Sequence, residues 1–127
     1  MEKEKGTKVL IIDDDVTLRE MYAERMKIEG YEILIAKNGE DGIVKAKEFK
    51  PNVILLDIMM PGTNGFGVLE TLQKNPDTEK IPILMLSALI QEENKKKSKK
   101  AGAIGYIVKS ETTPATVLEK VKEAVAK

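Results

Sequence analysis

The chain has 127 residues, of which 42% are hydrophobic, and its 21 basic and 21 acidic side chains give no formal net charge. This length fits one domain, and the balanced charge gives no whole-molecule attraction to nucleic acid or to a membrane. The absence of cysteine excludes disulfides and thiolate chemistry, and the absence of histidine excludes an imidazole general base and the Ser-His-Asp triad.

The first six residues are charged and short, which is not the pattern of a signal peptide or an anchor. We expect residues 1–6 to form a disordered tail and residues 7–127 to form a single domain. No apolar run approaches the roughly 20 residues of a membrane span, so we expect no membrane contact. Together with the absence of cysteine, this favours a cytoplasmic location.

Short apolar runs alternate along the chain with longer stretches of helical spacing. Breakers at Gly30, Lys50-Pro51 and Asn75-Pro76 separate the stretches. Strands that alternate with helices predict right-handed crossovers and a parallel sheet. The five predicted strands are Lys8–Ile12, Tyr31–Ala36, Asn52–Leu56, Ile81–Leu86 and Ile104–Val108.

The first and last helical stretches each show one apolar face. In the first stretch this face is predicted to hold Leu18, Met21, Tyr22 and Met26. The last helix is predicted to begin at Thr113-Pro114, a cap and first-turn pair. Its predicted buried face consists of Val117, Leu118, Val121, Ala124 and Val125.

The first, third and fourth strands are continuously apolar, as strands covered by helices on both faces must be. The second and fifth are interrupted by Glu32 and Gly105, which edge strands tolerate. These features predict a doubly wound α/β fold of the flavodoxin-like type, with a five-stranded parallel sheet in the order 2-1-3-4-5. In such sheets the functional site lies beyond the carboxyl ends of the strands.

Polar residues stand at the ends of the predicted strands. Asp13-Asp14-Asp15 follows the first, Asp57 the third, Ser87 the fourth and Lys109 the fifth. Each has a structural explanation: Asp15 fits a helix N-cap, a serine fits a turn, and a lysine is usually solvated. Asp57 is the hardest to explain structurally, because it interrupts an apolar run at the end of a central strand. The predicted sheet therefore brings several carboxylates, a hydroxyl and an ammonium to one edge.

Clustered carboxylates need a compensating charge. Two carboxylates about 4 Å apart repel by roughly 4 kcal/mol at an effective dielectric of 20. Oxygen-only ligands favour Mg²⁺, which takes one or two carboxylates together with a phosphate. A carboxylate beside such an ion can attack a phosphoryl group and form an acyl phosphate. This chemistry requires no general base and is compatible with the missing histidine.

Four motifs in order give the chain a resemblance to the receiver domain of two-component response regulators, from about Lys8 to Ala126. The resemblance implies a switch that accepts a phosphoryl group from a histidine kinase or a histidine phosphotransfer protein. The motifs are Val9-Leu10-Ile11-Ile12-Asp13-Asp14-Asp15, Leu55-Leu56-Asp57-Ile58-Met59-Met60-Pro61-Gly62, Leu86-Ser87-Ala88 and Gly105-Tyr106-Ile107-Val108-Lys109.

The resemblance also implies a role for each residue in the acidic region. Asp57 is the expected phosphoacceptor. Asp13 and Asp14 are the acidic pair expected to hold Mg²⁺ or Mn²⁺, with Asp14 the more direct ligand and Asp13 acting partly through water. Asp57 and the backbone carbonyl of Met59 complete the protein ligands.

A conformational switch is implied by the same resemblance. Ser87 is expected to move toward the phosphoryl oxygens, which Lys109 pairs with, and Tyr106 turns into the space that Ser87 leaves. The alternative to a switch role is a purely structural one, in which Tyr106 is a half-buried aromatic residue of a strand. Residues 89–122 form the face made by the fourth helix, the fifth predicted strand and the fifth helix. Repacking of this face then signals to an unknown output protein.

Two features of the sequence modify this expectation, the residue after Lys109 and the residues near the expected entry of water. The family usually places proline after its lysine, whereas Ser110 stands here, so the Lys109–Ser110 bond can be trans or a strained cis bond. Met59 and Leu89 flank the expected entry of attacking water. They lie two residues beyond Asp57 and Ser87, respectively. Because both are bulky and apolar, we expect slow loss of the phosphoryl group.

Residues Gln91–Ala101 carry five lysines and almost no apolar face. The structural interpretation is a solvated helix. The functional interpretation is a docking surface for an acidic partner. Nucleic acid is not expected, because aromatics make up only 4% of the chain, none lies in this stretch, and Glu92 and Glu93 dilute its charge.

Two alternatives compete with a receiver switch. Asp13-Asp14-Asp15-Val16-Thr17 also matches the Asp-x-Asp-x-Thr motif of haloacid-dehalogenase-type phosphatases, which would make Asp13 the nucleophile and leave Asp57 without a role. A receiver that serves only as a scaffold is the other alternative, and Ser110 alone favours it. The sequence leaves open whether the chain is a stand-alone receiver or part of a longer regulator.

Overall fold

A computed structural model describes residues 6–60, 62–88 and 92–126, except for the side chains of residues 17–19 and 63. Its main feature is a five-stranded parallel sheet in the order β2-β1-β3-β6-β7. Once the two short strands of a separate hairpin are set aside, this is the predicted 2-1-3-4-5 order. The sheet strands are β1 (Lys8–Ile12), β2 (Glu32–Ala36), β3 (Val53–Asp57), β6 (Ile83–Ser87) and β7 (Gly105–Val108).

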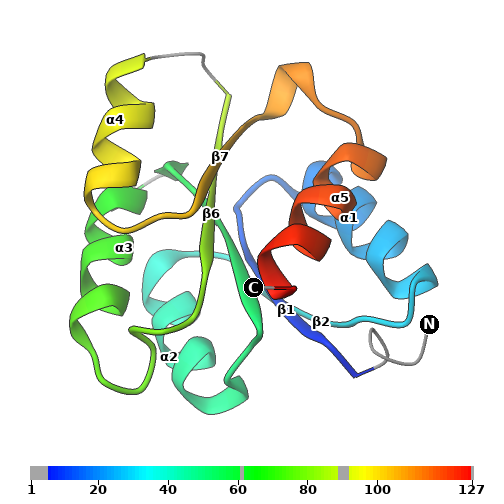
Figure 1. Cartoon of the computed structure of the whole chain (residues 1–127), viewed down its shortest axis with the longest axis horizontal. Helices are drawn as coiled ribbons and strands as arrows, with labels where there is room; N and C mark the ends of the chain where they lie inside the picture. Colours follow the sequence, from blue (N-terminus) through cyan, green and yellow to red (C-terminus); the bar gives the residue numbers. More distant parts are fainter. Residues whose placement is uncertain (1–5, 61, 89–91, 127) are drawn as a thin grey trace.

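Helices cover both faces of the sheet, as the doubly wound prediction requires (Figure 1). Helices α1 (Val16–Ile28) and α5 (Pro114–Val125) lie on one side. Helices α2 (Gly39–Phe49), α3 (Gly65–Lys74) and α4 (Glu92–Lys100) lie on the other. None of the helices within the described ranges has both the length and the apolar character that crossing a membrane requires.

The two helical layers enclose two hydrophobic clusters, one on each face of the sheet. Alternate residues of β1 enter different clusters: Val9 packs toward α1 and α5, and Leu10 packs toward α2 and α3. Both side chains are fully buried. A central strand therefore has no solvent-facing position, which explains the continuous apolar runs in the sequence.

The helix predictions hold in part. Tyr22 and Met26 are buried, but the prediction was wrong for Met21, which is 44% exposed. The buried stripe of α1 instead runs through Tyr22, Ala23 and Met26, and Met21 lies on its outer edge. The predicted face of α5 is confirmed, and Thr113 caps this helix by accepting a hydrogen bond from the Thr116 amide at 3.1 Å.

Some local features differ from the predicted boundaries. β3 and β6 each run one residue further than expected, so Asp57 and Ser87 are the last residues of their strands. Two short strands, β4 (Met59–Met60) and β5 (Thr63–Asn64), form an antiparallel hairpin before α3. Residues 1–5 of the predicted tail lie outside the described part. The Gly6 amide donates a hydrogen bond to the Gly30 carbonyl at 3.4 Å.

The first residue of α3, Gly65, packs directly against the strand that ends in Asp57. Its amide donates to the Ile58 carbonyl at 2.7 Å. A Cβ atom added at Gly65 would lie 2.6 Å from the Ile58 Cα and closer still to the Asp57 carbonyl oxygen. Gly67 lies two residues later in the same helix, and a Cβ there would meet nothing within 4 Å. Of these two glycines, only Gly65 is therefore required by packing.

This contrast predicts opposite effects of two glycine-to-alanine substitutions. Gly65→Ala should lower the free energy of unfolding by about 1–3 kcal/mol, because backbone atoms must move to admit the methyl group. Gly67→Ala should raise it by about 0.5–1 kcal/mol, because alanine is the better helix former. Urea unfolding followed by circular dichroism measures both. Equal stability of the two variants would contradict the close packing at Gly65.

Candidate functional site

The register of the sheet brings the candidate residues together at its carboxyl edge. Ile12 lies opposite Leu56, so the next residues on β1 and β3, Asp13 and Asp57, are neighbours across the two strands. On the far side of β3, Asp57 lies opposite Leu86, which precedes Ser87. Parallel pairing thus places the ends of the central strands side by side.

β7 completes this edge of the sheet. Val108 lies opposite Ser87 on β6, so Lys109 begins where β7 ends. The candidate residues from β1, β3, β6 and β7 therefore gather on the same edge, as the sequence predicted.

Three carboxylates form the centre of this edge. One carboxylate oxygen each from Asp13, Asp14 and Asp57 lies within 4.8 Å of the others. Asp13 and Asp57 are buried, with exposed fractions of 0% and 3%, whereas Asp14 is exposed. The cluster is therefore open to solvent on the side of Asp14 and closed toward the sheet.

The ammonium of Lys109 bridges the two buried carboxylates. Its Nζ atom lies 2.9 Å from Asp13 Oδ2 and 3.1 Å from Asp57 Oδ2. The side chain of Lys109 is only 11% exposed, so water screens these pairs weakly. The charge-assisted hydrogen bond to Asp57 and the close ion pair with Asp13 hold all three side chains in place in this buried setting.

Backbone amides occupy the other oxygen of each buried carboxylate. The Asp15 amide donates to Asp13 Oδ1 at 2.9 Å, and the Met59 amide donates to Asp57 Oδ1 at 3.3 Å. In both contacts the donor is the residue two positions after the aspartate, where the chain turns away from the strand. The loops after β1 and β3 thus orient the carboxylates.

Burial changes the protonation behaviour of the site. Burial raises the pKa of Asp57 from its ordinary value of 3.8 to about 7, and the charge of Asp13 acts in the same direction, whereas Lys109 opposes them. Burial alone lowers the pKa of Lys109, but the hydrogen bonds and charges of Asp13 and Asp57 outweigh this effect and raise it. The lysine is therefore a fixed cation, and the buried carboxyl of Asp57 binds a proton readily.

The donor set fits a divalent cation such as Mg²⁺. When all three carboxylates are ionised, they and the one ammonium leave two net negative charges in a partly buried cluster. All the side-chain donors are oxygens, which magnesium prefers. Asp13, Asp14 and Asp57 are the residues that would hold the ion, and the exposed position of Asp14 leaves space for its waters.

The remaining predicted site residues surround this cluster. Ser87 is 1% exposed at the end of β6. Tyr106, on β7, is half-buried and packs against the hydrophobic cluster on the α3 side of the sheet. Met59 begins the hairpin after Asp57, and its side chain is 66% exposed. Leu89, the other predicted flank of the entry, lies outside the described residues.

The loop after β7 was less predictable. No cis peptide bond occurs among the described residues, so the Lys109–Ser110 bond is trans. Residues Lys109–Glu111 form a short 3₁₀ helix, which the sequence analysis did not predict. The trans bond is compatible with the aim of Lys109 at both buried aspartates.

One residue near the cluster was not singled out from the sequence. Burial raises the pKa of Tyr22, on α1, with the charge of Lys109 opposing and the charges of Asp13 and Asp15 reinforcing the shift. The ring therefore lies within electrostatic reach of the acidic cluster. Its helical spacing identified Tyr22 only as a core residue, because periodicity carries no information on which end of the sheet a side chain approaches.

We predict that the metal-free protein loses stability as the pH rises through the range in which Asp57 ionises. The folded state binds the proton more tightly than the unfolded chain does, so the free energy of unfolding falls between the two pKa values. Between about pH 5 and pH 8, wild type should lose roughly 1–3 kcal/mol more than Asp57→Asn.

Urea unfolding in the presence of a chelator measures this difference. Asp77→Asn is the matched control, because Asp77 lies in an exposed turn away from the cluster, and it should keep the wild-type slope. Identical slopes for wild type and Asp57→Asn would contradict the shifted pKa.

Known proteins share both the sequence and the fold of the chain. The sequence model of the response regulator receiver domain family matches residues 9–122. Protein PilH of Pseudomonas aeruginosa is 40% identical over 104 residues, which cover 80% of this chain and 84% of PilH. The high-resolution structure of the chemotaxis response regulator CheY4 of Vibrio cholerae has a TM-score of 0.86 and 31% identity, covering 94% of this chain and 99% of the CheY4 chain.

Other relatives are longer. The phosphate regulon transcriptional regulatory protein PhoB of Pseudomonas aeruginosa is 40% identical over 104 residues, but these cover 82% of this chain and only 45% of PhoB. The chain thus spans less than half the length of this transcriptional regulator. The family match extends over most of the chain and includes every residue of the acidic cluster. The chain belongs to the response regulator receiver domain family, whose members act in phosphorylation-dependent signalling.

Proposed function

We propose that the chain is a signalling switch in which Asp57 accepts a phosphoryl group from a histidine kinase or a histidine phosphotransfer protein, with Mg²⁺ or Mn²⁺ as cofactor. The observation that carries this proposal is the placement of Asp57, a buried carboxylate at the end of a central strand. It lies next to the acidic residues Asp13 and Asp14 and within 3.1 Å of the Lys109 ammonium.

The transfer step needs few groups from the protein. A carboxylate oxygen of Asp57 forms a bond to phosphorus, the bond from phosphorus to the donor's imidazole nitrogen breaks, and its electron pair returns to the imidazole. Lys109 is already positioned to pair with the phosphoryl oxygens once they replace its contact with Asp57 Oδ2. Asp13, Asp14, Asp57 and the Met59 carbonyl would hold a divalent ion. This ion would neutralise charge on the same phosphoryl oxygens.

The proposed chemistry is that of a phosphoacceptor with self-catalysed loss of the group, and not that of a turnover enzyme. The chain has no histidine to act as a general base toward attacking water. The exposed Met59 side chain follows Asp57 closely at the hairpin and places an apolar group at the solvent side of the cluster. Both features favour slow hydrolysis of the acyl phosphate.

The proposed output travels through Ser87 and Tyr106 to the face formed by α4, β7 and α5. The buried Ser87 lies at the end of β6, opposite Val108 on the strand that carries Tyr106. A cavity of about 570 Å³ lies between α4 and β7, lined by Tyr106 together with Ser98 and Ile104. Movement of the tyrosine ring would change this cavity and hence the surface that an output protein meets.

Intact-mass spectrometry after incubation with acetyl phosphate tests the phosphoacceptor. Wild type with Mg²⁺ should gain one phosphoryl group, and the gain should fall by at least about tenfold in Asp57→Asn and in the presence of a chelator. A phosphoryl group found on Asp13 would contradict the proposal and favour the phosphatase-type alternative. Retention of the adduct in Asp57→Asn would contradict it as well.

The switch is tested separately with Ser87→Ala. This variant should still accept the phosphoryl group on Asp57, but amide chemical shifts along α4, β7 and α5 should change much less on phosphorylation than in wild type. The reason is that alanine cannot donate the hydrogen bond that draws residue 87 toward the phosphoryl oxygens. Ser110→Ala, on the exposed surface beyond Lys109, is the matched control and should keep the full shift changes.

A further inference from the structure

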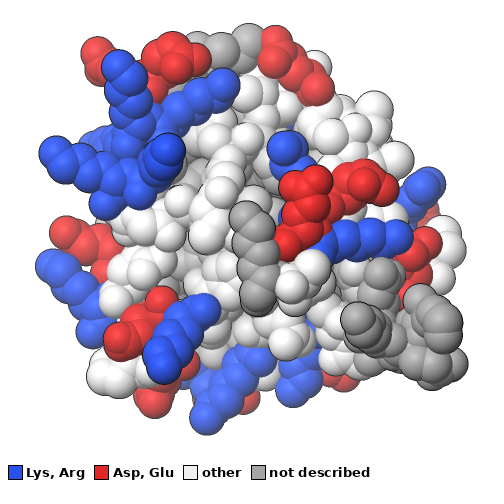
Figure 2. Space-filling model, viewed as in Figure 1, with Lys and Arg blue, Asp and Glu red and all other residues white. Residues whose placement is uncertain are grey.

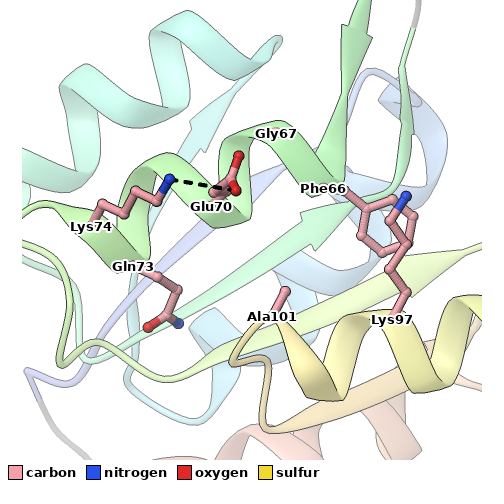
Figure 3. A pocket seen from close by; sticks show the side chains of 7 residues that line it. All are labelled: Phe66, Gly67, Glu70, Gln73, Lys74, Lys97 and Ala101. Atoms are coloured by element: carbon pink, nitrogen blue, oxygen red, sulfur yellow. Dashed lines mark ion pairs between the residues drawn. The ribbon is translucent and has the colours of Figure 1, made fainter.

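A second groove lies between α3 and α4, on the side of α4 that faces away from β7 (Figure 3). It has a volume of about 420 Å³ and is lined by Phe66, Gly67 and Gln73 from α3, by Lys97 from α4 and by Ala101, which follows α4. None of these residues belongs to the acidic cluster, and although Lys97 lies on α4, none of them lines the cavity along β7. The groove therefore has no role in the phosphoryl chemistry described above.

Lysines dominate the α4 side of this groove. Helix α4 carries five lysines against two glutamates, a net charge of +3 in a chain whose total is zero. Lysine side chains accordingly gather over α4, at the upper left of Figure 2. Within the helix, Lys95 and Glu92 form an ion pair at 3.7 Å that joins two exposed side chains. The helix thus presents a concentrated positive charge to solvent.

The α3 side of the groove is apolar at Phe66 and Gly67 and charged at Glu70 and Lys74. The ring of Phe66 is half-buried, and the Lys97 ammonium lies 4.4 Å from its centre, so the two side chains meet at one end of the groove. Gly67 adds no side chain, although a Cβ there would meet nothing within 4 Å. A helix interior normally favours alanine over glycine, so the glycine keeps surface bare where a side chain would fit.

The other end of the groove is closed by a hydrogen bond. Gln73 Nε2 donates to the Gly102 carbonyl at 3.3 Å, linking α3 to the residue pair that follows α4. A Cβ at Gly102 would lie 2.9 Å from the Gln73 side chain. The two helices are therefore joined at both ends of the groove, by Phe66 with Lys97 and by Gln73 with Gly102, and the space between them remains open.

We propose that this groove binds an acidic segment of a partner protein that carries an apolar side chain. The apolar side chain would enter the space beside Phe66 and over Gly67, and carboxylates of the segment would pair with Lys97 and the neighbouring lysines of α4. A volume of about 420 Å³ suits a few side chains and not a whole helix.

Nucleic acid fits this groove less well. The Phe66 ring is half-buried and has the Lys97 ammonium over it, so a base would have to displace Lys97 to stack there. Glu70 also lines the groove, and its ion pair with Lys74 at 3.5 Å offsets its negative charge toward any acidic ligand. Both side chains are exposed, and Figure 3 shows them joined along α3. The observations therefore favour an acidic peptide over a polynucleotide.

Fluorescence anisotropy with a labelled peptide of about twelve residues, composed of Asp, Glu and two Leu, tests the proposal on the unphosphorylated chain. Lys97→Glu and Gly67→Leu should each weaken binding by about tenfold or more, the first by reversing a charge and the second by filling the space. Lys47→Glu makes the same charge change in the exposed last turn of α2 and should alter binding by less than about twofold.

Each other outcome would overturn the proposal. Equal weakening by Lys47→Glu and Lys97→Glu would indicate attraction by total charge alone. Binding of an oligothymidylate of equal length as tightly as the peptide would indicate a general polyanion surface. Peptide-induced amide shifts centred on Ile104 and Tyr106, and not on Gly67 and Ala101, would place the peptide in the groove along β7. Because the assay uses no phosphoryl donor, a negative result leaves phosphorylation of Asp57 unaffected.

Discussion

The bridge from the Lys109 ammonium to the carboxylates of Asp13 and Asp57 is the interaction on which the rest of the site depends. Parallel strands place Asp13 and Asp57 side by side, with their oxygens in one small cluster. At such a distance two carboxylates repel by roughly 4 kcal/mol at an effective dielectric of 20. The sheet can keep both buried only because a cation reaches them from the end of β7.

This arrangement was predictable because parallel sheets bring the carboxyl ends of their strands to one edge. Polar residues at the ends of apolar runs, such as Asp57 and Ser87, could therefore be grouped without knowing any distance. The hairpin of β4 and β5 could not, because strands of two residues leave no periodicity to detect. The trans bond at Ser110 was likewise open, since its geometry depends on the fold of the loop after β7.

The lysine-rich segment shows a different limit of sequence reasoning. Its composition correctly indicated a helix with a solvated surface, and among the described residues of α4 only Ser98 is buried. The sequence did not indicate what lies beside the helix. Phe66 and Gly67 are distant in the chain, and only the packing of α3 next to α4 places an aromatic ring under Lys97. Hydrophobic periodicity assigns a residue to a face, but it does not identify the neighbour of that face.

Helix α4 borders both grooves, one along β7 that Tyr106 lines and one along α3 that Phe66 lines. Since it buries little of its own surface, its position depends on weak contacts on each side. A ligand that holds α4 against α3 must then alter the free energy of any rearrangement that moves α4 relative to β7. Linkage makes this effect reciprocal: phosphorylation would change the affinity of the α3 groove by the same factor by which an occupant of that groove changes the switch.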